Sequence, residues 1–169
     1  MHHHKWLIVT GHIMRLLGQG MYWQELRTGD RFKTYGRTIA AHDVAAFCNV
    51  VGIVEPLFTD AEYRAKHSAM SGLVVPGVQV YAVAEGLVLA GCGHGTGMAS
   101  LQAELDVKGP VQAGDTVSVR FEITEARASS KGRGLVRSRN EVVNQHGELV
   151  LVYAALRLMA GRPDERVSV

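Results

Sequence analysis

Residues 73–90, LVVPGVQVYAVAEGLVLA, decide the fold of this chain. Glu85 is the one charged residue of this stretch, and a segment that is apolar on almost every side is expected to form a helix buried on most of its faces. A membrane span is the alternative, but Pro76, Gln79 and Gly86 interrupt the segment and strand-rich sequence follows it. We therefore expect a long buried helix from Leu73 to Ala90 and no membrane association.

The sequence after this helix alternates between apolar and polar residues and predicts four strands. Leu101–Val107 and Val117–Thr124 have a period of two, which is typical of half-buried strands. Leu135–Val143 and Leu149–Met159 follow, joined by the turn Asn144–Gly147. A curved antiparallel sheet wrapped around the helix buries the apolar face of each. The predicted fold class is therefore α+β, with one long central helix.

Three shorter elements are expected before the helix. Phe32–Ile39 has the composition of a strand, and Ala41–Val51 carries apolar residues at helical spacing. Asp60–Lys66 predicts another short helix, capped by Thr59 or Asp60.

Composition limits the class of protein. The chain has 169 residues, of which 47% are apolar and 20% charged, which is typical of one globular domain. A net charge of +2 with scattered Lys and Arg residues predicts no nucleic-acid partner. Cys48 and Cys92 match neither a disulfide framework nor a set of zinc ligands, so we expect no metal and a reducing, cytoplasmic location.

The two ends of the chain differ from the middle. Residues 1–20 are interpreted as a leader, tag-like or disordered, because His2–His4 resemble a tag and His12 and Arg15 interrupt any signal-peptide core. Adventitious metal binding by the three histidines is the alternative. We expect a single domain over residues 21–161 and a C-terminal tail over 162–169.

Residues 47–60, FCNVVGIVEPLFTD, resemble the hydratase segment of MaoC-like acyl-CoA dehydratases. That segment follows the pattern Gly-Asp-x-Asn-Pro-(Leu/Ile)-His, and its Asp and His activate the water that adds across an enoyl thioester. Further matches occur in the family's order and spacing at Tyr22–Asp30, Asp60–Tyr63, Leu73–Gly77, Gly114–Val117 and Asn144–Glu148. The resemblance covers Tyr22 to Ala160 and implies a hot-dog fold.

The resemblance also implies a set of substrate-binding residues. Ile53 and Phe58 stand where the family has Asp and His, and neither side chain can transfer a proton. In the family the helix that starts at Pro76, Gly77 and Val78 points free backbone N–H groups at the thioester carbonyl. The alternative is that Pro76 and Gly77 simply begin a buried helix.

Glu55 is the candidate replacement for the missing acid and base. It stands at the family's Asn position, in a segment that is otherwise apolar, and burial there would favour a carboxyl that exchanges protons near neutral pH. A positioned acid or base contributes about 10²- to 10⁴-fold to a rate. The alternatives are a solvated Glu55 or one paired with Arg or Lys.

The resemblance therefore implies an acyl-CoA hydratase or dehydratase with an atypical acid/base group, needing no cofactor because CoA is part of the substrate. The first alternative is a non-catalytic acyl-thioester-binding protein or the silent subunit of a hetero-oligomer, and the second is a thioesterase that uses Glu85. Hot-dog sheets usually pair edge to edge, so we expect a homodimer or higher oligomer. Arg64, Lys66 and His67 either contact a CoA phosphate or face water, and His94 either covers a pocket or belongs to an ordinary glycine-rich turn, Gly91–Gly97.

Overall fold

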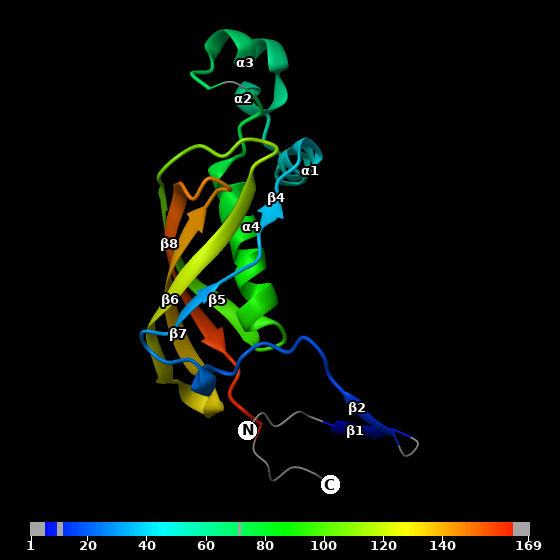
Figure 1. Ribbon diagram of the computed structural model, residues 1–169, viewed down its shortest axis with the longest axis vertical. Helices are drawn as coiled ribbons and strands as arrows, with labels where there is room; N and C mark the ends of the chain where they lie inside the picture. Colours follow the sequence, from blue (N-terminus) through cyan, green and yellow to red (C-terminus); the bar gives the residue numbers. More distant parts are fainter. Residues whose placement is uncertain (1–5, 10–11, 71, 164–169) are drawn as a thin grey trace.

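The computed structural model describes residues 6–9, 12–70 and 72–163. Its main body is an antiparallel sheet that curves around one helix (Figure 1). The strands lie in the order β3–β6–β7–β8–β5, and β4 pairs with another part of β6. Their bounds are β3 Arg31–Lys33, β4 Arg37–Thr38, β5 Gly97–Val107, β6 Thr116–Ala128, β7 Gly134–Val143 and β8 Leu149–Met159. The predicted α+β fold with a central helix is confirmed.

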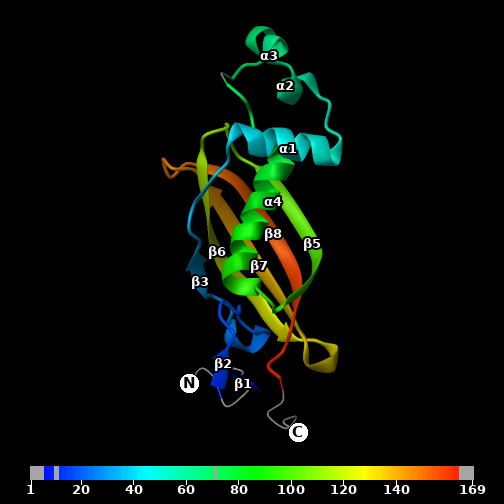
Figure 2. The same ribbon diagram turned by 90° about the vertical axis from the view of Figure 1, so that its right-hand side faces the viewer.

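The central helix α4 spans Gly77–Val88 and lies against the inner face of the sheet (Figure 2). It begins four residues after the predicted start at Leu73. The intervening residues are extended, because the Val75 N–H donates a hydrogen bond to the Val111 carbonyl at 2.8 Å and ties them to the neighbouring chain. At its other end the helix continues into a π-helical turn, Leu89–Gly93, so the predicted glycine-rich turn is partly helical.

The hydrophobic core lies between α4 and the inner face of the sheet. The alternation predicted for β6 is confirmed, since its inward residues are buried and each buried Val, Ile or Phe side chain contributes about 1.5–3 kcal/mol. On β8, every second residue from Leu151 to Met159 is buried as well. The helix contributes Val80, Ala84 and Val88 to the same core.

The strand β5 differs from its prediction. It forms one edge of the sheet, and all of its residues are exposed. Leu105 pairs with the inward-facing Tyr153, so its side chain points to the concave side of the sheet, where the helix does not cover it. The helix also has an open stripe, formed by Val78, Ala82, Gly86 and Leu89. Nine of the twelve residues of α4 are buried or half-buried, so the prediction of a helix buried on most faces is confirmed, with this one stripe left open.

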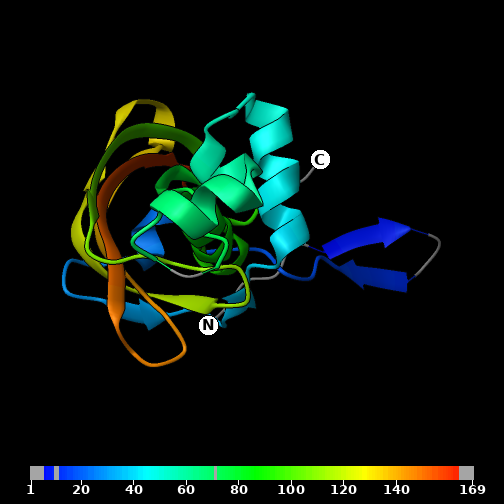
Figure 3. The same ribbon diagram turned by 90° about the horizontal axis from the view of Figure 1, so that it is seen from above.

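Three helices lie above the N-terminal end of α4 (Figure 3). They are α1 Ala41–Val51, α2 Pro56–Thr59 and α3 Ala61–His67, so the predicted bounds of α1 are confirmed. The Asp43 carboxylate accepts a hydrogen bond from the Ala40 N–H at 2.9 Å at the start of α1. Asp60, rather than Thr59, caps α3 and accepts from the Tyr63 N–H at 3.0 Å.

The strand predicted over Phe32–Ile39 is interrupted. It is divided into β3 and β4, because the Val119 N–H donates to the Thr34 hydroxyl at 3.0 Å instead of to a backbone carbonyl. Gly36 follows at a close approach, where an added Cβ would lie 2.9 Å from the Thr116 methyl group. The hydrogen bond to the Thr34 side chain and the close contact at Gly36 therefore interrupt the regular backbone pairing with β6 between β3 and β4.

The described part of residues 1–20 includes two paired antiparallel strands, β1 Trp6–Val9 and β2 His12–Arg15, which stand apart from the main sheet in Figure 1. The chain joins the domain at Gly20, whose N–H donates to the His94 carbonyl at 2.7 Å. At the other end, Arg162 pairs with Glu25 at 3.1 Å. The His2–His4 run and residues 164–169 lie outside the described residues, and the proposed domain boundaries stay predictions.

Candidate functional site

An apolar pocket of about 320 Å³ opens at the N-terminal end of α4. Its walls come from the helix, the ends of β5 and β8, the segments beside them and one phenylalanine of α2. The lining residues are Phe58, Met70, Val74, Val75, Gly77, Val80, Val107, Gly109, Pro110, Val111, Val150 and Leu151. None of these lining side chains is ionisable, so the pocket is suited to an apolar group.

The start of α4 supplies hydrogen-bond donors beside this pocket. Pro76 is buried and is the residue that precedes the helix, and its carbonyl accepts from the N–H groups of Gln79 at 2.8 Å and Val80 at 3.1 Å. Within the described residues, the N–H groups of Gly77 and Val78 donate no hydrogen bond. A helix N-terminus of this kind stabilises negative charge on a nearby oxygen.

The structure brings some of the predicted substrate-binding residues together. Phe58 and Gly77 line the pocket, and Pro76 lies directly before the helix. Ile53 is half-buried and packs against the hydrophobic core, whereas Val78 is exposed on the open stripe of α4. Their roles in binding a substrate stay predictions.

Glu55 occupies the position before α2, where its carbonyl accepts from the Phe58 N–H at 2.9 Å. Its side chain is exposed, so the expected apolar surroundings are not found in the single chain. No ion pair or hydrogen bond within the part of the chain that the structure describes engages its carboxylate. The structure therefore places Glu55 three residues from the pocket wall at Phe58, with its carboxylate in solvent.

A second hollow, of about 560 Å³, adjoins the pocket and shares Met70 with it. Arg64 lines this hollow, is half-buried, and donates to the Leu57 carbonyl at 3.4 Å. Lys66 is exposed and pairs with Glu62 at 3.7 Å across one helical turn. Of the three basic residues predicted on α3, Arg64 is thus the one that lies beside the pocket.

The remaining candidates lie elsewhere. His94 is exposed and follows the π-helical turn, while Cys48 and Cys92 are both free and buried. Burial raises the pKa of the Cys92 thiol, which keeps it protonated and unreactive. No cluster of potential metal ligands occurs among the described residues, and no described helix is long and apolar enough to cross a membrane. The cytoplasmic location stays a prediction.

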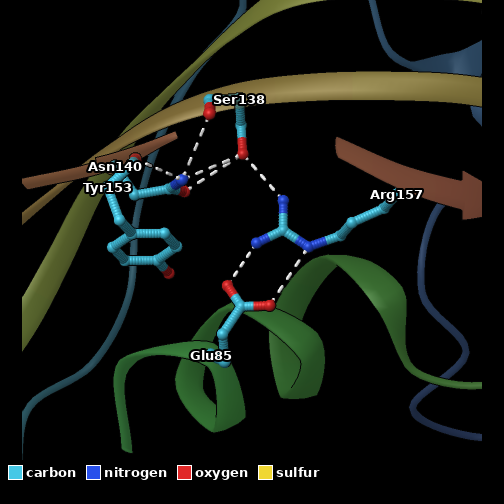
Figure 4. A network of polar contacts seen from close by, with 5 residues as sticks. All are labelled: Glu85, Ser138, Asn140, Tyr153 and Arg157. Carbon is cyan, nitrogen blue, oxygen red and sulfur yellow. Dashed lines mark hydrogen bonds and ion pairs between the residues drawn. The ribbon is translucent and has the colours of Figure 1, made fainter. Parts of the chain in front are cut away.

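A network of polar side chains lies deeper in the core, between α4 and the sheet (Figure 4). Glu85 of α4 and Arg157 of β8 form an ion pair, in which Arg157 Nε donates to Glu85 Oε2 at 3.3 Å and Nη2 donates to Oε1. Arg157 Nη1 donates to Ser138 Oγ at 2.7 Å. Asn140 Nδ2 joins Ser138 Oγ at 3.1 Å and the Tyr153 carbonyl at 3.0 Å.

Sequence analysis missed the partners of Glu85 in this network. The signal was available, because Arg157 interrupts the inward-facing apolar positions of β8 between Ala155 and Met159. A charged residue at such a position needs a buried partner. Glu85 does not line the apolar pocket and is bound by Arg157, so its position gives no support to the thioesterase hypothesis.

The architecture defines the class of protein, the hot-dog proteins, in which a curved antiparallel sheet surrounds a central helix. A conserved hypothetical protein of Mycobacterium tuberculosis with a double hot-dog fold superimposes with a TM-score of 0.77 at 24% identity, over 88% of this chain and 47% of that one. The sequence model of the MaoC-like domain family matches residues 24–145 of this chain, so the chain belongs to this family. The predicted fold and family are both confirmed.

Two further solved structures resemble the chain over nearly their whole length. A MaoC-like dehydratase from Rhodospirillum rubrum is 26% identical with a TM-score of 0.71, over 85% of this chain and 99% of that one. R-hydratase PhaJ1 from Pseudomonas aeruginosa, in its unliganded form, is 25% identical with a TM-score of 0.69, over 89% and 97%. No curated protein matches the chain.

Proposed function

We propose that the chain binds acyl-CoA or another acyl thioester, with the acyl group in the apolar pocket and the thioester carbonyl at the N–H groups of Gly77 and Val78. The observation that carries this proposal is the pocket itself, which is apolar throughout and opens where α4 presents free donors. Arg64 in the adjoining hollow supplies a positive charge for a phosphate of CoA. No cofactor is required, because CoA arrives as part of the substrate.

The reaction that this arrangement supports is hydration of an enoyl thioester or its reverse, and the hydratase and dehydratase named above support it by similarity. Donors at the carbonyl stabilise the enolate that forms when the oxygen of water bonds to the β carbon. A base must take one proton from that water, and an acid must return a proton to the α carbon. We propose the Glu55 carboxylate for both transfers, since no described side chain engages it and its backbone adjoins the pocket wall.

The test is hydration of short and branched trans-2-enoyl-CoA thioesters. The reaction is monitored through the decrease in absorbance as the conjugated enoyl thioester is consumed. Glu55→Gln is expected to lower the rate by about 10²- to 10⁴-fold without preventing binding. Glu62→Gln is the matched control, because Glu62 is an exposed carboxylate on the neighbouring helix α3. Equal rates for Glu55→Gln and the wild type would remove Glu55 from the mechanism.

A second candidate function, acyl-thioester binding without turnover, is favoured by the absence of ionisable side chains from the pocket lining and by the exposure of Glu55. It includes the silent subunit of a hetero-oligomeric dehydratase. Binding of acyl-CoA with no turnover of any enoyl-CoA would support it, as would co-purification with a second hot-dog chain that carries an intact Asp and His.

A further inference from the structure

A hollow of about 630 Å³ lies beside the outward-facing residues of β6, away from the apolar pocket. Its walls come from the end of β3, the connection from β3 to β4, the first half of β6 and the turn between β7 and β8. The lining residues are Lys33, Thr34, Tyr35, Gly36, Thr116, Ser118, Arg120, Val143, Asn144, Gln145 and Gly147. Two of these side chains are cations and none is a carboxylate, so the hollow is suited to an anion.

The two cations of the hollow lie directly opposite each other. Lys33 of β3 and Arg120 of β6 are partners in the strand register, and both are exposed. Neither forms an ion pair within the described residues, whereas Arg31, the preceding outward residue of β3, pairs with Glu122 at 2.8 Å. Like charges directly opposite each other on neighbouring strands are destabilising. An anion that contacts both Lys33 and Arg120 would relieve this repulsion.

Carboxylates occur around the hollow, but other groups bind them. Glu141, the partner of Arg120 in the register of β6 and β7, forms its ion pair with Arg139. At the rim, Gln145 donates a hydrogen bond to Asp115 at 2.7 Å. The two cations are therefore left without a counter-charge in the part of the chain that the structure describes.

A hydroxyl group adds a neutral donor beside the two cations. Ser118 is half-buried on the same face of β6 as Arg120, two residues before it, and its hydroxyl has no hydrogen-bond partner among the described residues. The Thr34 hydroxyl, in contrast, is engaged, because it accepts from the Val119 N–H at 3.0 Å. The guanidinium of Arg matches a phosphate with two parallel N–H groups, and Lys acts on it as a point charge.

We propose that this hollow binds a phosphate group, with Lys33 and Arg120 as its counter-charges and the Ser118 hydroxyl as a third donor. A phosphate suits these groups better than a carboxylate, because it carries up to two negative charges and three strong acceptor oxygens. The phosphate is either a free anion or part of a larger ligand such as CoA. The site is independent of the proposed function, since it shares no lining residue with the apolar pocket.

The experiment is an NMR titration of isotope-labelled protein with inorganic phosphate, in which chloride keeps the ionic strength constant. The wild type is compared with the double variant Lys33→Gln, Arg120→Gln and with the control variant Lys131→Gln, Arg133→Gln. The control also removes one Lys and one Arg, but from the loop at the other end of β6. Spectra recorded without phosphate establish that each variant keeps the fold.

The wild type is expected to show saturable shifts of the backbone amide signals of Lys33, Ser118 and Arg120. The double variant at the hollow is expected to bind phosphate at least about tenfold more weakly, which corresponds to the loss of charged hydrogen bonds, and the control variant to bind as the wild type does. Absence of saturable shifts at the hollow in the wild type would overturn the inference, whether or not any variant folds. Equal affinity of the double variant and the wild type would also overturn it.

Competition with CoA distinguishes the two sources of the phosphate. If CoA displaces inorganic phosphate from the wild type and dephospho-CoA does not, the hollow takes the 3′-phosphate of CoA. If neither compound displaces it, the ligand is a free phosphate or another phosphorylated molecule. Both results support the site.

Discussion

Replacing Arg157 by methionine is expected to destabilise the fold more than an ordinary core substitution. The side chains of Arg157 and Glu85 are 7% and 12% exposed, so the ion pair is largely removed from water. Arg157→Met leaves the Glu85 carboxylate buried without its counter-charge and removes the 2.7 Å bond to Ser138. Breaking a buried pair from one side costs about 3–5 kcal/mol. The total stability of a domain is only about 5–15 kcal/mol, so this loss is a large fraction of it.

The free energy of unfolding is best measured by urea denaturation, followed by the fluorescence of Trp6 and Trp23. Three proteins are compared: the wild type, Arg157→Met, and the double variant Glu85→Met with Arg157→Met. The double variant is expected to recover most of the loss, because two apolar side chains of similar length replace the pair and leave no buried charge. The slope of the free energy against urea concentration must be unchanged for the comparison to hold.

Two results would refute this reasoning. If Arg157→Met lowered the free energy of unfolding by less than about 1 kcal/mol, the pair would contribute no more to stability than an exposed salt bridge does. A double variant as unstable as the single one would show that the network is needed for packing rather than for charge balance.

Three other perturbations test separate parts of the structure. Gly134→Ala should destabilise by about 1–3 kcal/mol in urea denaturation, because the added Cβ would overlap the Trp23 ring; unchanged stability would mean that this ring moves freely. Light scattering should show that the chain is a dimer, because β5 is an exposed edge strand that a second copy can cover. Leu105→Arg places a charge on this strand and should make the protein monomeric. A monomeric wild type would contradict an interface at this edge. The hydrogen bond from Arg127 holds the pKa of Glu125 below its usual range. The stabilising effect of this bond is therefore present above the unfolded-state pKa and is lost as the pH falls through the lower folded-state pKa. NMR titration of Arg127→Ala should show the pKa of Glu125 moving upward, and an unmoved pKa would contradict this cause.

Local patterns in the sequence predicted most of the elements because they follow from short-range physical chemistry. The helix Ala41–Val51 is confirmed with its bounds, and so is the strand Leu149–Met159. Periodicity of apolar residues reports which face of an element is buried, and this holds wherever the partner surface belongs to the same chain. The start of α4 was misplaced because the pairing of Val75 with Val111 is a long-range contact that no local pattern encodes.

The site was predicted less completely. The resemblance to the family implied that Phe58 and Gly77 bind the substrate, and both residues line the pocket. The expected burial of Glu55 was not found, since apolar neighbours in sequence do not surround a side chain that points away from them. Sequence analysis did not pair Glu85 with Arg157, which lies 72 residues further along the chain.

The sequence by itself determined the fold class, the family and the order of the elements, because these depend on periodicity, turn chemistry and motif spacing along the chain. Only the tertiary structure decided where the charged side chains lie, with Glu85 and Arg157 together in the core and Glu55 in solvent. The physical reason is that the energy of a polar group depends on what surrounds it in space, and those surroundings come from distant parts of the chain.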